Sequence, residues 1–202
     1  MSDATTTWNE MKRRHAEVCA TGQVGIAPEP RRPAAAVLAC SDARVPPSLM
    51  FGHPGELFVV RLAGNSATPG AIASLTYAVE QLDTDLVVVL GHTGCGAVQA
   101  ALASDAPSTF DAIVTPIDEM LTACGDCDDI DAAVTANVRH NVRRLRRDRG
   151  PLGHAVRAGR VVLRGAIHDV RTGHLIDLDD HLDHDHQDHD HPSTPIPARS
   201  TS

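Results

Sequence analysis

The chain has 202 residues and a formal net charge of −8 at pH 7, a length that suits one domain with a sizeable core. The acidic balance argues against a nucleic-acid partner, and no apolar run reaches the roughly 18–20 residues that span a bilayer, so no membrane partner is expected. No signal-peptide pattern opens the chain, and its five cysteines are an odd number too sparse for a disulfide scaffold, which predicts a cytoplasmic protein with free thiols.

Short apolar runs alternate with segments of helical spacing along the chain. In chain order we expect a helix over 7–19, a proline-rich loop over 22–33, a strand over 34–39, a short helix from the 46–47 proline pair through 51, a strand over 57–61, a helix over 69–82, a strand over 86–90, helices over 94–103, 110–123 and 129–149, and a strand over 161–167. Because nearly every strand is apolar throughout, the fold class is α/β, with a mostly parallel central sheet flanked by helices.

The C-terminal part of the chain has a different composition. Five histidines and seven aspartates fall between Asp177 and His191. We therefore expect one catalytic domain over 1–178 and a disordered, low-complexity tail over 179–202. Two interpretations of the tail stay open: a solubilising segment, or a loose store of metal ions or protons.

Two cysteine motifs follow two of the predicted strands. Cys40 comes directly after the strand over 34–39, and His92-Thr93-Gly94-Cys95 follows the strand over 86–90. Ligand sites of parallel sheets lie at the carboxyl ends of strands, so both motifs are expected at one edge. Two thiolates and one imidazole are the protein ligands of a catalytic zinc site that keeps its fourth position free. Burial as small apolar side chains is the alternative for either cysteine alone.

The motifs resemble those of the β-class carbonic anhydrases, over roughly residues 30–178. The resemblance rests on these segments: Cys40-Ser41-Asp42-Ala43-Arg44-Val45-Pro46-Pro47, Pro54-Gly55-Glu56-Leu57-Phe58-Val59-Val60-Arg61, Ala63-Gly64-Asn65, Ser74-Leu75-Thr76-Tyr77-Ala78-Val79, Gly91-His92-Thr93-Gly94-Cys95-Gly96-Ala97-Val98 and the stretch from Gly165 to Gly173. It implies the family's fold, with an N-terminal helical arm that packs across a partner chain, and a homodimer or tetramer.

The resemblance also implies a carbonate dehydratase that interconverts CO₂ and bicarbonate through a zinc-bound hydroxide. Cys40, His92 and Cys95 would hold the Zn²⁺. Asp42 would orient the hydroxide, and Arg44 would hold Asp42 away from the metal through a charge-assisted pair. If that pair breaks, Asp42 can take the fourth metal position, and the sequence leaves open which arrangement is adopted. A structural ion pair near the surface is the alternative for these two residues.

Other residues align with the walls of the family's substrate pocket: Phe58, Ala63, Gly64 and Tyr77. Packing in the core is the alternative for the two aromatic residues. The chain departs from the common pattern at Arg31, where many members have glutamine, and at Leu62, where many have asparagine. An arginine in the pocket would favour bicarbonate or another anion. A hydrolase of carbonyl sulfide or carbon disulfide, or a non-catalytic protein that binds zinc or bicarbonate, is the alternative function.

Two further patterns concern a cysteine pair and a run of arginines. Cys124-Gly125-Asp126-Cys127 has the spacing of redox and zinc motifs, so a surface loop, a reversible disulfide and an accessory metal clip all stay open. The arginine-rich helix over 129–149 lacks interleaved aromatic residues, so a solvated face or a subunit contact is favoured over nucleic-acid binding.

Overall fold

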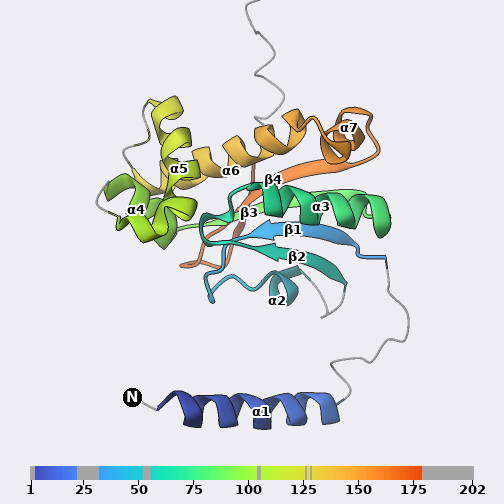
Figure 1. Ribbon diagram of the computed structural model, residues 1–202, viewed down its shortest axis with the longest axis vertical. Coiled ribbons are helices and arrows are strands. Elements are labelled where there is room, and N and C mark those ends of the chain that lie inside the picture. The colour runs from blue at the N-terminus through green and yellow to red at the C-terminus, as the bar shows by residue number, and fades with distance from the viewer. Residues whose placement is uncertain are drawn as a thin grey trace, which may run out of the picture.

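The computed structural model describes residues 3–21, 32–51, 56–103, 106–125, 127 and 129–178. Its centre is a five-stranded sheet in the order β2-β1-β3-β4-β5. The strands are β1 (Ala35–Ala39), β2 (Leu57–Arg61), β3 (Leu86–His92), β4 (Val162–His168) and β5 (Leu175–Asp177). The first four pair in parallel, and β5 runs antiparallel to β4. The expected α/β class with a mostly parallel sheet is confirmed (Figure 1).

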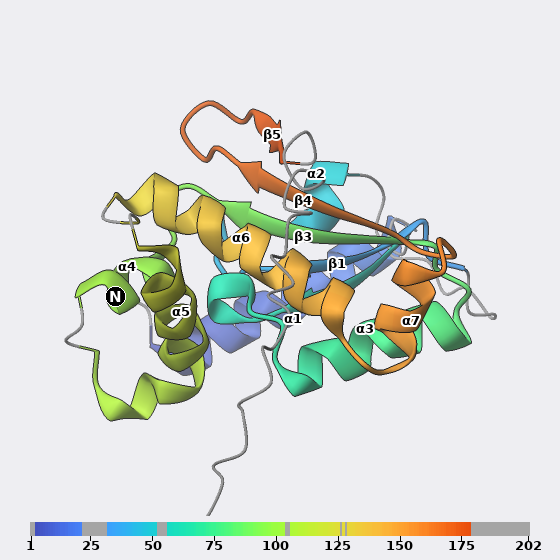
Figure 2. The same ribbon diagram turned by 90° about the horizontal axis from the view of Figure 1, so that it is seen from above.

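Helices cover one face of the sheet far more fully than the other. In Figure 1 the face with more helices carries α3 (Pro69–Gln81), α6 (Ile130–Arg147) and α7 (Pro151–Arg157), and the opposite face carries the short α2 (Pro47–Phe51). Figures 1 and 2 both place α4 (Gly96–Ala103) and α5 (Asp111–Cys124) at the end of the sheet to which β1 and β3 point. Two short 3₁₀ turns complete the described elements, η1 (Ala63–Asn65) and η2 (Ser108–Phe110). No helix within the described ranges is both long and apolar enough to cross a membrane.

The sequence of β1 explains its central position. All five of its residues are buried, as expected for a strand covered on both faces. Val37 lies beside Val59 of β2 and Val88 of β3, so the ends of these three strands are aligned. The residues that follow β1 and β3 therefore meet at one edge of the sheet.

Helix α6 provides much of the packing against β3 and β4. An apolar stripe on this helix is fully buried and consists of Val134, Val138, Val142 and Leu145. The Asp129 carboxylate caps the start of α6 by accepting hydrogen bonds from the backbone N–H groups of Asp131 and Ala132.

Three features of the fold differ from the sequence-based expectations. Strand β3 extends two residues past the predicted end, because His92 still pairs with His168 of β4. Helix α7 and strand β5 were not predicted, since each is short and β5 is exposed along its whole length.

Helix α1 (Ala4–Ala20) buries none of its residues against its own chain. Figure 1 shows it apart from the sheet, on the side where α2 lies. Trp8 and Met11 are each 57% exposed on this helix, although both are large apolar side chains. A helix with such a face needs a partner to cover it.

Gly91, next to His92 in β3, has no room for a side chain. A Cβ there would lie 2.5 Å from Val138 Cγ2 and 3.5 Å from Val134 Cγ1. We expect Gly91→Ala to lower the free energy of unfolding by about 1–3 kcal/mol, because α6 must move away from the sheet. Urea unfolding in the presence of a chelator measures this effect without any contribution from bound metal.

Gly70→Ala is the matched control, because no atom lies within 4 Å of the added Cβ. This change in the first turn of α3 is expected to leave stability unchanged or raise it by up to about 1 kcal/mol. Equal urea midpoints for Gly91→Ala and the unchanged chain would contradict the packing argument.

Candidate metal centre

Cys40, His92 and Cys95 come together where β1 and β3 end. Their ligand atoms all lie within 4.8 Å of one another, and all three residues are buried. The two sulfur atoms are 3.9 Å apart. Parallel pairing of β1 with β3 brings Cys40 to the His92–Cys95 turn, although 55 residues separate the two cysteines in the chain. The structure thus brings together the three residues expected as metal ligands.

The His92 ring is oriented as a metal ligand requires. Its Nδ1 lies 3.0 Å from the carbonyl oxygen of Thr93. A carbonyl only accepts, so Nδ1 carries the proton and Nε2 presents a lone pair. That Nε2 is buried and has no hydrogen-bond partner among the described residues. An unpartnered nitrogen facing two thiols is costly without a cation, so the three residues fit a metal ion.

The two thiols are electrostatically unequal. The hydrogen bond from Cys95 contributes most to lowering the pKa of the Cys40 thiol. The neighbouring Cys40 thiolate and burial raise the pKa of Cys95. Without a metal, Cys40 therefore loses its proton before Cys95 does. A bound cation would stabilise both residues as thiolates.

Asp42 and Arg44 form a bidentate ion pair at the mouth of this group. The Arg44 side chain donates from Nε to Oδ1 at 2.9 Å and from Nη2 to Oδ2 at 2.6 Å. The guanidinium holds the pKa of the Asp42 carboxyl well below its ordinary value. Asp42 Oδ2 lies 3.9 Å from His92 Nε2, and Arg44 Nη2 also reaches the carbonyl of Gly94 at 3.3 Å. The pair therefore bridges the two cysteine motifs.

Arg61 secures the loop that carries Cys40 and Asp42, a role that the sequence did not suggest. At the end of β2, its Nε donates to the carbonyl of Cys40 at 2.9 Å and its Nη2 donates to that of Asp42 at 2.6 Å. The sequence offered one signal for this role, a charged residue at the end of an apolar strand. Its partners become apparent only once β2 pairs with β1.

The four expected pocket residues lie in two places. Gly64 is buried in η1, directly after Ala63. Phe58 and Tyr77 form a tilted ring pair with centroids 6.3 Å apart. Tyr77 is 54% exposed in the single chain, so it does not belong to the core of this chain.

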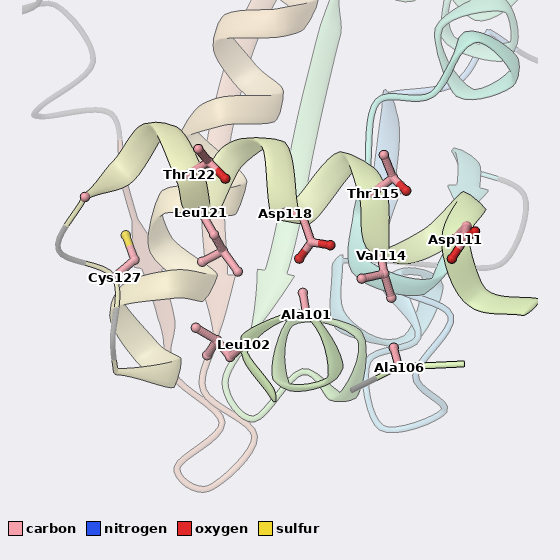
Figure 3. Close-up of a pocket in the computed structure, with 11 residues that line it drawn as sticks. Ala101, Leu102, Ala106, Asp111, Val114, Thr115, Asp118, Leu121, Thr122 and Cys127 are labelled. Atoms are coloured by element: carbon pink, nitrogen blue, oxygen red, sulfur yellow. The ribbon is translucent and has the colours of Figure 1, made fainter. Parts of the chain in front are cut away.

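A cavity of about 450 Å³ lies elsewhere, between α4 and α5, and none of the three candidate ligands lines it. Figure 3 shows Val114, Asp118 and Leu121 of α5 pointing toward α4 across this space. Cys127 also lines the cavity and is joined to Cys124 by a disulfide. Of the interpretations left open for this cysteine pair, the structure has the disulfide. Arg31 and the tail over 179–202 lie outside the described residues.

Comparisons with known proteins agree with this geometry. The family model described as carbonic anhydrase matches residues 35–175. A carbonic anhydrase of Mycolicibacterium smegmatis is 32% identical over 161 residues, which cover 75% of this chain and 77% of the relative. A carbonic anhydrase of Pseudomonas aeruginosa is 33% identical over 163 residues, which cover 73% and 74% of the two chains.

Solved structures show the same fold. The β-carbonic anhydrase CafA of Aspergillus fumigatus is 26% identical with a TM-score of 0.70, covering 88% of this chain and 91% of the other. The Coccomyxa β-carbonic anhydrase, solved with acetazolamide, has a TM-score of 0.73 at 23% identity, covering 88% and 87%. With the family model matching most of its sequence, this chain belongs to the β-class carbonic anhydrases, which are carbonate dehydratases.

Proposed function

We propose that the protein catalyses the reversible hydration of CO₂ to bicarbonate and a proton, with Zn²⁺ held by Cys40, His92 and Cys95. The observation that carries this proposal is the buried Cys–His–Cys group with a carboxylate–guanidinium pair at its open side. Two thiolates and an imidazole suit zinc among the common divalent metals. A zinc ion held there would supply an electrophilic centre that lowers the pKa of water toward about 7.

The residues around the metal position have separate tasks in this proposal. The Thr93 carbonyl fixes the His92 ring, so its Nε2 faces the metal position. Asp42 stays ionised beside Arg44 and offers an acceptor to the nucleophilic water. Both Asp42 oxygens accept from Arg44, which supports the arrangement with the carboxylate held off the metal. Gly64, Ala63, Phe58 and Tyr77 are proposed to line the CO₂ pocket.

Stopped-flow measurement of CO₂ hydration tests this function. Protein loaded with one zinc per chain is expected to accelerate the pH change of a CO₂ solution above the buffer rate at about pH 8, where zinc-activated water is ionised. A rate equal to that of buffer would overturn the proposal. Turnover of carbonyl sulfide without turnover of CO₂ would favour the hydrolase alternative instead.

We further propose that the active form is at least a homodimer, in which α1 of each chain covers the sheet of the other. The uncovered face forms an apolar groove of about 340 Å³, lined in part by Val37, Leu57 and Val88. Trp8 and Met11 lie one turn apart on α1 and are exposed, and they supply a matching apolar stripe. A solved relative from Sordaria macrospora is described as tetrameric.

Replacing Trp8 and Met11 together by serine is expected to shift the protein toward monomer, because the helix then loses its apolar stripe. Sedimentation velocity across a dilution series measures the shift. Serine at Arg13 and Glu17, an ion pair on the opposite face of α1, is the control and should leave assembly unchanged. Assembly that survives the Trp8 and Met11 changes would show that α1 does not hold the subunits together.

A further inference from the structure

Thr93 lies between two of the candidate metal ligands, and hydrogen bonds fix both of its backbone groups. The residue is 7% exposed, and its carbonyl oxygen accepts from Nδ1 of His92 at 3.0 Å. Its backbone N–H donates to the carbonyl of His168 at the end of β4, also at 3.0 Å. The orientation of the His92 ring therefore depends on how firmly Thr93 is held.

The Thr93 hydroxyl joins this residue to the turn that follows β4. Its Oγ1 accepts from the backbone N–H of Val170 at 3.1 Å and donates to Asp169 Oδ1 at 3.2 Å. A hydroxyl has one proton to donate and can also accept, so both of its functions are used. The two hydrogen bonds cross 77 and 76 positions of sequence, and they tie the end of β3 to the end of β4.

Asp169 is itself held in place by the turn that it begins. Its side chain is 15% exposed. Arg171 donates to Oδ1 from its backbone N–H at 2.9 Å and from Nε at 3.2 Å. Thr172 Oγ1 donates to the other oxygen, Oδ2, at 3.0 Å. The carboxylate is therefore a fixed acceptor for the hydroxyl of Thr93.

We propose that Thr93 and Asp169 are positioning residues for the metal centre. The Asp169 carboxylate anchors the Thr93 side chain, and the anchored residue keeps its carbonyl on the His92 ring. The inference rests on the proposed function, because it treats His92 as a ligand of the metal. A hydrogen bond to the outer nitrogen of a ligating imidazole fixes its tautomer and its direction, so a looser hydrogen bond weakens metal binding. A hydroxyl that only filled space would leave metal affinity unchanged when a methyl group replaced it.

Thr93→Val removes the hydroxyl and keeps the shape of the side chain. We expect its zinc affinity to fall by about 10-fold, the lower end of the range for outer contacts, because the hydroxyl acts on the ring through the carbonyl. Competition with a chromophoric chelator measures the dissociation constant of zinc. NMR of zinc-loaded protein with isotope-labelled histidine adds a second readout, since the Nδ1–H of His92 should exchange with water faster in the variant. Thr93→Ser keeps the hydroxyl and should match the unchanged chain in both measurements.

Thr84→Val is the matched control for the loss of a buried hydroxyl. Thr84 is 2% exposed, and its hydroxyl has no hydrogen-bond partner among the described residues. It precedes β3 at the end opposite His92. This variant should keep the zinc affinity of the unchanged chain.

Asp169→Ala tests the other half of the contact and should also weaken zinc binding by about 10-fold. Its control is Thr172→Ala, which removes a hydrogen bond within the turn but leaves Oδ1 on Thr93, so zinc affinity should stay the same. Unchanged zinc affinity in both Thr93→Val and Asp169→Ala would overturn the positioning role while leaving the zinc site intact. Equal losses in Asp169→Ala and Thr172→Ala would overturn it too, because the effect would then belong to the turn alone. An unchanged chain that binds no zinc in the same titration would overturn the proposed site itself.

Discussion

Cys40→Ser is expected to lose zinc and activity together. The hydroxyl is a poor zinc ligand and the remaining imidazole and thiol cannot close the site. We expect metal affinity to fall by more than about 100-fold, beyond the range for outer contacts. Zinc content after dialysis against a chelator, followed by stopped-flow CO₂ hydration, measures both losses on one sample.

Cys19→Ser is the control for this experiment. Cys19 is a free, exposed thiol on α1, far in the chain from the buried trio. Its variant should keep one zinc per chain and the full rate. If Cys40→Ser also kept one tightly held zinc with undiminished turnover, the ligand assignment would be wrong.

Asp42→Asn is expected to separate metal binding from turnover. The amide has nearly the shape of the carboxylate, so one zinc per chain should remain. It lacks the charge that pairs with both Arg44 nitrogens and is a weaker acceptor. We expect kcat to fall by about 10–100-fold. Parallel assays of zinc content and CO₂ hydration test this separation.

Asp85→Asn supplies the matched control. Asp85 also pairs with an arginine, Arg32, but its side chain is 63% exposed and it precedes β3 at the end opposite His92. An exposed ion pair of this kind contributes little to stability, so Asp85→Asn should leave the free energy of unfolding and the rate of CO₂ hydration unchanged. Full activity in Asp42→Asn would assign Asp42 and Arg44 to the alternative role of a surface ion pair.

The first four strands could be predicted from sequence because each is a short, largely apolar run. The run over 35–39 has no polar residue that would permit an exposed face. The end of β3 could not be placed, since His92 joins the sheet only by pairing with His168. Strand β5 has three exposed residues and no apolar pattern, and its pairing with β4 alone makes it a strand.

The metal ligands could be predicted because two cysteines and a histidine are typical protein ligands of zinc. The residue that fixes the backbone around them could not be predicted. Arg61 meets the carbonyls of Cys40 and Asp42 across 21 and 19 positions of sequence. An arginine at a strand end carries no local sign of such partners. These contacts follow from tertiary packing, so only the folded chain reveals them.

The separation of the ligands along the chain has a consequence for how the protein acquires its metal. His92 and Cys95 are neighbours, but Cys40 reaches them only after β1 has paired with β3. The unfolded chain therefore offers no complete set of three ligands, and tight binding follows sheet formation rather than guiding it. Metal then stabilises the native state by mass action, as any ligand does that binds only the folded form. The apoprotein should reach the same fold by itself, ready to be loaded afterwards.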